Sequence, residues 1–119
     1  GIRHMALKVA DMEKAEKFYA GILGYRVEWR PDSDNVYLIR DKDNLALHKA
    51  SVSPGGSLDH FGIALKTAQD VDVWAAHLQS RGVSLQKAPK THRDGARSFY
   101  VNDPEGNTIQ FIYHPPIAG

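Results

Sequence analysis

Apolar residues recur along the first part of the chain with two different periods. From Met5 to Val9 every second residue is a large apolar one, which is typical of a strand with one face on a core. Over residues 15–23 apolar side chains recur at spacings of three and four, which predicts an amphipathic helix. Asp11 is placed to cap the start of this helix and Gly24 to end it. Three short apolar runs, separated by turn residues, then predict three strands.

The second part of the chain repeats this pattern. An alternating run at residues 61–65 precedes a second helical pattern, which Thr67 with Asp70 begins and Gly82 ends. Three further strand-like runs follow. The sequence therefore predicts an α+β fold of two tandem βαβββ modules, which form a curved, half-open mixed β-sheet around a central cavity with the helices outside.

A direct comparison of the two copies supports the repeat. A shift of 56 positions lays the first strand and helix of one copy on those of the other, with His4 on His60. After the loops the shift becomes 62, which lays His48 on Gln110. We expect a single domain over residues 1–119, made of repeats at about 1–52 and 57–114.

Length, charge and composition exclude several classes of protein. A chain of 119 residues is long enough for one core but not for two full-sized domains. The formal net charge is +1 without blocks of like charge, so we expect no nucleic-acid partner. The sequence has no cysteine, which excludes disulfides and thiolate chemistry and fits a reducing compartment. No apolar run approaches the roughly eighteen residues of a membrane span, so we expect a cytoplasmic protein without a membrane partner.

Three histidines fall on strand positions that alternate with core positions. His4 and His60 are related by the repeat, and His48 is related to Gln110. Their neighbours on the same faces are small and leave a hollow; these are Ala6, Ala46, Gly62 and Ala64. Imidazole suits Zn, Ni, Fe and Cu, so the four side chains predict a metal site with open positions for water or substrate. The alternatives are histidines with ordinary hydrogen bonds and polar residues that line a pocket.

Four motifs carry a family resemblance. They are the runs His4-Met5-Ala6-Leu7-Lys8-Val9-Ala10-Asp11, Phe18-Tyr19, Leu23-Gly24-Tyr25 and Asp103-Pro104-Glu105-Gly106-Asn107-Thr108-Ile109-Gln110. With them, nearly the whole chain resembles the vicinal oxygen chelate superfamily, which includes glyoxalase I, extradiol dioxygenases and bleomycin-resistance proteins. The resemblance implies paired modules that close around a divalent metal ion, which holds two substrate oxygens, commonly in a homodimer. It also implies metal ligands at His4, His48, His60 and Gln110.

Gln110 departs from the pattern of the family. Metal-dependent members that this chain resembles usually have Glu at this position, where it also takes part in proton transfer in glyoxalase I. An amide cannot accept a proton near neutral pH and brings no negative charge to a metal ion. The departure therefore leaves the general base, and the catalytic residues as a whole, unassigned.

Other side chains are candidates for binding a substrate. His92 lies among the extra residues of the second copy and Arg97 just after them; either could orient an anionic part of the substrate, with a charged surface loop as the alternative for His92. Trp29, Tyr37 and Tyr100 could line an aromatic or apolar pocket, with simple packing as the alternative.

Two functions from different classes follow. The first is a metal-dependent enzyme of the glyoxalase and dioxygenase type (a lyase, isomerase or dioxygenase), in which one divalent ion per site, Zn, Ni, Mn or Fe(II), chelates vicinal oxygens of a small-molecule substrate. The second is a metal-free protein that sequesters a small ligand and resembles bleomycin-resistance proteins. The three histidines favour the first function, and Gln110 favours the second. Because the strand edges and helix faces of two small modules need covering, we also expect a homodimer.

Overall fold

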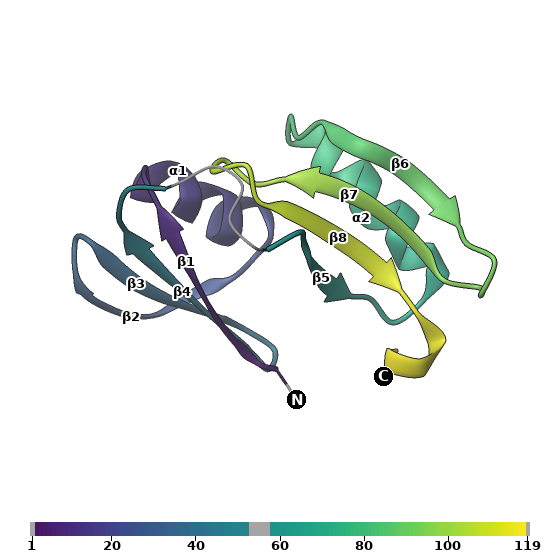
Figure 1. Ribbon diagram of the computed structural model, residues 1–119, viewed down its shortest axis with the longest axis horizontal. Coiled ribbons are helices and arrows are strands. Elements are labelled where there is room, and N and C mark those ends of the chain that lie inside the picture. The colour runs from purple at the N-terminus through teal and green to yellow at the C-terminus, as the bar shows by residue number, and fades with distance from the viewer. Residues whose placement is uncertain (1, 53–57, 119) are drawn as a thin grey trace. The chain divides into compact units, whose positions relative to one another are not determined.

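The computed structural model describes residues 2–52 and 58–118. These residues belong to two compact units, unit 1 (Gly1–Pro54) and unit 2 (Gly55–Gly119), which are drawn in Figure 1. The limits expected for the repeats at residues 1 and 57 lie outside the described residues. Within the described part of the chain, no helix is long and apolar enough to cross a lipid bilayer.

Unit 1 is a four-stranded mixed sheet with one helical segment after its first strand. Its elements are β1 (His4–Val9), α1 (Met12–Glu16), the π-helical η1 (Lys17–Ile22), β2 (Arg26–Asp32), β3 (Asn35–Arg40) and β4 (Asp43–Lys49). The strand order is β1-β4-β3-β2, with β1 parallel to β4 and the other neighbours antiparallel.

Unit 2 repeats this arrangement. Its elements are β5 (Phe61–Ala64), α2 (Ala68–Ser80), β6 (Leu85–Thr91), β7 (Arg97–Asn102), β8 (Thr108–Tyr113) and the short 3₁₀ helix η2 (Pro115–Ile117). The order is β5-β8-β7-β6, with β5 parallel to β8. The predicted α+β fold of two βαβββ modules is confirmed; that both sheets surround one cavity within a single domain stays a prediction.

Each sheet packs one face against its own helical segment, which lies on that face in Figure 1. In unit 2, α2 contacts β6, β7 and β8. The side chains of this layer are buried, as the apolar periods predict; they include Leu7, Val9, Phe18, Tyr19, Val36, Leu38, Leu45 and Leu47 in unit 1, and Val71, Leu78, Phe99, Val101, Ile109 and Phe111 in unit 2. The opposite face of each sheet is left to the residues that alternate with these.

Both predicted helix starts are confirmed. The Asp11 carboxylate accepts a hydrogen bond from the Lys14 amide, and Thr67 and Asp70 form a reciprocal capping box. Gly24 and Gly82 follow the two helical segments with φ of 86° and 82°, a left-handed conformation that favours glycine. The helical segment predicted between Asp11 and Gly24 is present, and its second half, Lys17–Ile22, is π-helical.

Thr67→Ala is expected to lower the free energy of unfolding by about 1 kcal/mol. The substitution removes the hydroxyl that accepts from the Asp70 amide, and so leaves an unpaired N–H at the start of α2. Urea unfolding followed by circular dichroism measures the change. Thr67→Ser is the control, because it keeps the hydroxyl and should keep most of the stability.

The structure corrects the predicted alignment of the later strands. Gln110 lies opposite Gly62, and Ala46 lies opposite Ala6, so Ala46 rather than His48 is the repeat counterpart of Gln110. The shift between β4 and β8 is therefore 64 positions, and the predicted 62 was wrong. The loops differ in length: residues 41–42 join β3 to β4, whereas residues 103–107 join β7 to β8.

Candidate functional site

The faces of the two sheets opposite their helices carry the histidines predicted to be functional. In β1, His4, Ala6 and Lys8 alternate with the buried Leu7 and Val9. In unit 2, Gly62 and Gln110 are neighbours on the corresponding face. We call these two surfaces the open faces of unit 1 and unit 2.

His4 is held by an amide on the neighbouring strand. Its Nδ1 atom lies 2.6 Å from Oδ1 of Asn44, its register partner on β4. The Nδ2 group of Asn44 donates to Oε1 of Glu28 at 3.3 Å, which fixes the amide with its oxygen toward the imidazole. His4 therefore donates from Nδ1–H, and its Nε2 atom carries the free lone pair.

His48 has the same arrangement at a different place. Its Nδ1 atom lies 2.6 Å from Oδ1 of Asn35 on β3. The Asn35 amide nitrogen donates to both carboxylate oxygens of Asp32, at 2.9 and 3.2 Å. A carboxylate thus orients an asparagine, and the asparagine orients the histidine, in two places on the open face of unit 1.

His60 is held directly by a carboxylate. Its Nδ1 atom lies 2.6 Å from Oδ2 of the adjacent Asp59, and its ring packs edge-on against Tyr100 with centroids 5.6 Å apart. All three predicted histidines therefore have Nδ1 bound to an oxygen, which is how metal-binding histidines are commonly oriented. Sequence reasoning missed the partners Asn44, Asn35 and Asp59, although Asp59 precedes His60 in the chain.

The register of β1 and β4 separates the two histidines of unit 1. His4 lies opposite Asn44, whereas His48 lies opposite Lys8, four positions further along the strands. At about 3.3 Å per residue the separation is roughly 13 Å, too far for both imidazoles to contact one ion. In the described residues, no group of three or more His, Cys, Asp or Glu side chains is placed to hold a metal ion. The prediction that His4 and His48 share an ion therefore conflicts with the register.

Gln110 lies on β8 between a small and an aromatic neighbour. Its register partners are Gly62 on β5 and Tyr100 on β7. A side chain on Gly62 would come no closer than 3.6 Å to the backbone oxygen of Gln110, so this position is small without being strictly confined to glycine. The Gln110 side chain is half-exposed on the open face of unit 2.

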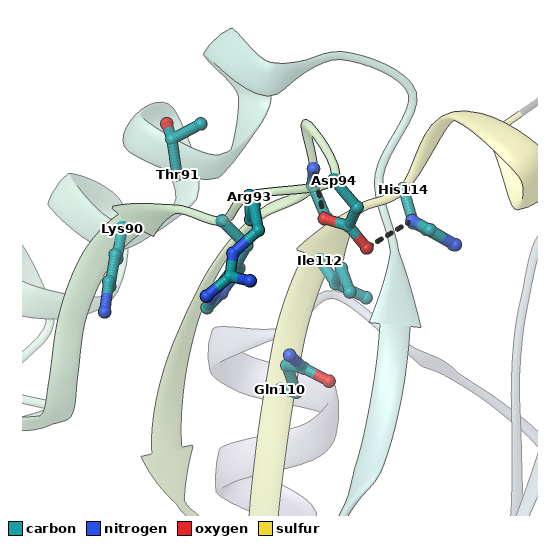
Figure 2. A pocket seen from close by; sticks show the side chains of 9 residues that line it. Lys90, Thr91, Arg93, Asp94, Gln110, Ile112 and His114 are labelled. Atoms are coloured by element: carbon teal, nitrogen blue, oxygen red, sulfur yellow. Dashed lines mark hydrogen bonds and ion pairs between the residues drawn. The ribbon is translucent and has the colours of Figure 1, made fainter.

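A cavity of about 750 Å³ opens on unit 2 beside Gln110 (Figure 2). Its lining is Lys90, Thr91, His92, Arg93, Asp94, Ala96, Gln110, Ile112 and His114. His92 is one of the predicted substrate residues; its Nε2 atom lies 2.9 Å from Oγ of the buried Ser98, which ties the β6–β7 loop to β7.

Arg97, the second predicted substrate cation, is engaged elsewhere. Its Nε and Nη2 groups donate to the two carboxylate oxygens of Asp72 on α2, at 3.0 and 2.7 Å, and Nη1 donates to Thr91. The hydrogen bond to Arg97 lowers the pKa of Asp72, and the same bond raises the pKa of Arg97. The arginine that lines the cavity is Arg93, which sequence reasoning missed although it lies in the same loop.

The predicted aromatic residues surround the histidines. Trp29 is 59% exposed and stacks on Tyr37 with ring centroids 5.3 Å apart, and Tyr37 packs edge-on against His48 at 5.8 Å. In unit 2, Lys87 Nζ lies 5.4 Å from the centroid of the Tyr100 ring. An exposed aromatic stack beside an oriented imidazole suits a flat or apolar ligand.

Residues 1–111 match the model of the glyoxalase/bleomycin resistance protein/dioxygenase superfamily. The chain belongs to this superfamily. Solved structures of similar fold include an integron cassette protein from the metagenome of the Halifax Harbour sewage outfall (TM-score 0.83, 24% identity, 96% of this chain and 98% of that one). They also include the lactoylglutathione lyase of Agrobacterium tumefaciens (TM-score 0.82, 18% identity, 100% of this chain and 97% of that one).

Curated members of the superfamily with related sequences are named as enzymes. The chain is 26% identical to the trivalent organoarsenical cleaving enzyme of Bacillus sp. (strain MD1), over 95% of this chain and 79% of that protein. It is 27% identical to the catechol-2,3-dioxygenase of Bacillus subtilis (strain 168), over 97% of this chain but only 42% of that protein. The chain thus spans less than half the length of this dioxygenase.

Superfamily members commonly use a divalent metal ion, and three side chains of this chain are of types that bind such ions. His4 and His60 each keep Nε2 free while Nδ1 is bound, and Gln110 offers an amide oxygen. No carboxylate takes the place of Gln110 on β8. Each of these three donors is thus uncharged, and brings no negative charge to an ion that it binds.

Proposed function

We propose that this chain is a metal-dependent enzyme of the superfamily, acting on a small substrate with two adjacent oxygens. His4, His60 and Gln110 hold one divalent ion. The observation that carries this proposal is the orientation of the two imidazoles, whose Nδ1 atoms are bound by Asn44 and Asp59 so that Nε2 is left as the ligand atom.

When bound, the ion supplies Lewis-acid stabilisation of negative charge that develops on the substrate oxygens. The chain's own side chains keep the ligands in position: Asn44 and Asp59 fix the imidazole rings, and the core positions beside Gln110 fix β8. Gln110 cannot take a proton from the substrate. His48 lies four positions further along the strands than His4, too far to take a proton from a substrate on the ion, so the general base stays unassigned.

The reaction is of the lyase, isomerase or dioxygenase type. Cleavage of a trivalent organoarsenical, the activity in the name of one relative, is disfavoured because trivalent arsenic prefers thiolate ligands and this sequence has no cysteine. Ring-opening of a catechol requires a redox-active ion such as Fe(II), which enzymes of this kind hold with two histidines and a carboxylate. The proposed site has an amide in place of the carboxylate, so this reaction is disfavoured as well. A non-redox reaction fits the neutral donor set best, on a substrate in which an enolisable carbonyl lies next to a second oxygen.

The metal-free alternative is a protein that sequesters its ligand. Gln110 and the exposed Trp29–Tyr37 stack favour it, because an amide and aromatic rings serve to bind a ligand without any ion. The oriented histidines are the observation that this alternative leaves without a role.

Metal content separates the two functions. The purified chain is incubated with Zn, Ni, Mn or Fe(II), desalted and measured by mass spectrometry, together with a His4→Ala, His60→Ala double variant. We expect about one equivalent of ion in the parent and none in the double variant. His77→Ala is the matched control, because it removes an imidazole from α2 and should retain the ion. If the parent retains no ion, the enzyme proposal fails and the sequestering function replaces it.

A further inference from the structure

The cavity beside Gln110 is lined by two positively charged side chains that form no ion pair with a carboxylate among the described residues. Lys90 and Arg93 both line it, and Figure 2 shows their charged ends pointing in the same direction from β6 and the loop that follows. Among the described residues, neither side chain has an ion pair, in contrast to Arg97 on Asp72 and Arg30 on Glu16. Two like charges held near each other without a carboxylate between them favour an anionic ligand.

The one carboxylate of the lining, Asp94, is partly occupied by its own loop. Its Oδ1 atom accepts from the Ala96 amide at 3.0 Å, and its Oδ2 atom lies 3.9 Å from Nδ1 of His114. Both contacts are drawn in Figure 2. Asp94 therefore shapes the loop and faces His114, and the lining as a whole keeps two cationic side chains against one carboxylate.

A histidine and two apolar side chains also line the cavity. The Nδ1 atom of His114 is buried and has no hydrogen-bond partner among the described residues. Because an unpaired buried nitrogen is costly, a ligand in the cavity that bonds to it would be favoured. Ile112 and Ala96 supply apolar surface, which suits the carbon skeleton of an organic ligand.

We propose that this cavity binds the carboxylate group of the substrate, with Arg93 as its main partner and Lys90 as the second. The substrate class is then a small organic carboxylate. An arginine binds a carboxylate through two parallel hydrogen bonds, and an exposed guanidinium without another partner is free to do so. The excess of one positive charge matches a monoanion, whereas a phosphate or a nucleotide would need more cationic groups.

This inference rests on the proposed function only through Gln110, which lines the cavity and is also assigned to the ion. A substrate with its carboxylate at Arg93 therefore extends toward the proposed metal ligand. The carboxylate site itself needs no ion, so the two proposals can fail separately.

Benzoate and benzamide are the probes, because they have the same shape and differ in charge. Each is titrated into the ¹⁵N-labelled chain, with and without EDTA, and binding is followed by the side-chain resonances of Arg93 and Gln110. We expect benzoate to bind at least about tenfold more tightly than benzamide, and equally well in EDTA. Binding of benzoate that disappears in EDTA would mean that it ligates an ion and not the cavity, and would overturn the inference.

Variants that remove one positive charge test whether benzoate binds in this cavity. Arg93→Gln is expected to weaken benzoate about tenfold and Lys90→Gln less, whereas Lys42→Gln removes an exposed charge of unit 1 and should change nothing. Equal benzoate affinity in Arg93→Gln and the parent would overturn the inference. If the chain retains a metal ion but does not bind benzoate, the proposed function stands and the carboxylate site is wrong. If the chain binds benzoate but retains no ion, the carboxylate site stands and the proposed metal-dependent function is wrong.

Discussion

His4→Ala is expected to lower the affinity of the chain for a divalent ion by at least about a hundredfold, while His48→Ala lowers it less than about threefold. Both variants remove one imidazole from the open face of unit 1. They differ only in the position of that imidazole along the sheet. The contrast therefore tests the position of the ion and not merely the number of histidines.

The register gives the physical reason for the contrast. His4 lies at the start of β1, level with Asn44, and His48 lies level with Lys8 near the end of the same strand. A separation of roughly 13 Å along the strands lets one ion reach only one of them. We assign the ion to His4 because its repeat counterpart is also a histidine, His60, and both have Nδ1 bound to a side-chain oxygen, of Asn44 for His4 and of Asp59 for His60.

Competition with a chromophoric chelator measures both affinities. The two asparagines give a matched pair of milder variants. Asn44→Ala should lower the affinity for the ion about tenfold or more, because it leaves the His4 ring without its hydrogen-bond partner. Asn35→Ala leaves His48 without its partner and should not change the affinity. Unchanged affinity in His4→Ala together with a large loss in His48→Ala would contradict the assignment and place the ion at the other end of β4.

The architecture of both units could be predicted from the periods of the apolar residues. Thr67 with Asp70 begins α2 and Gly24 follows η1, because capping and left-handed turns depend on residues close in the chain. The π-helical half of the first helix carries no such local signal. Its apolar stripe, with Phe18 and Tyr19 buried, fits a wider helix as well as a regular one.

The candidate site was predictable in its residue types but not in its register. The shift that aligns β1 with β5 was found, because His4 and His60 share one face of equivalent strands. The predicted alignment of β4 with β8 was in error by two positions, since the loop before β8 is longer and an error of an even number keeps the apolar residues of the strand on the core side. The pairing of His48 with Gln110 was the result of that error.

The hydrogen-bond and ion-pair partners of the side chains could not be predicted from the sequence. Arg97 and Arg93 stand four positions apart around one loop, and composition does not distinguish them. Only the position of Asp72 on α2 decides that Arg97 is bound on the helix side, while Arg93 is left at the cavity. Likewise, Asn44 and Asn35 orient histidines from neighbouring strands, so their role depends on pairing that distant parts of the chain make.

Phe111→Ala is expected to lower the free energy of unfolding by about 3 to 5 kcal/mol. Phe111 is 1% exposed, and its ring stacks on Phe99 with centroids 4.9 Å apart and an interplanar angle of 2°. The ring of Trp74 on α2 stacks on it as well, at 5.8 Å. Truncation therefore removes a ring packed between α2 and the sheet and leaves a cavity that the two remaining rigid rings, of Phe99 and Trp74, cannot close.

Urea unfolding of the metal-free chain measures this loss without a contribution from a bound ion. Val73→Ala is the matched control, because Val73 is 57% exposed on α2 and its truncation should change the stability by less than about 0.5 kcal/mol. If Phe111→Ala does not fold, Phe111→Leu, which keeps most of the volume, should still show a loss of about 1 kcal/mol. A loss below that in both variants would contradict the packing of β8. Since Phe111 is the neighbour of Gln110, the same core that stabilises unit 2 holds the proposed ligand in place.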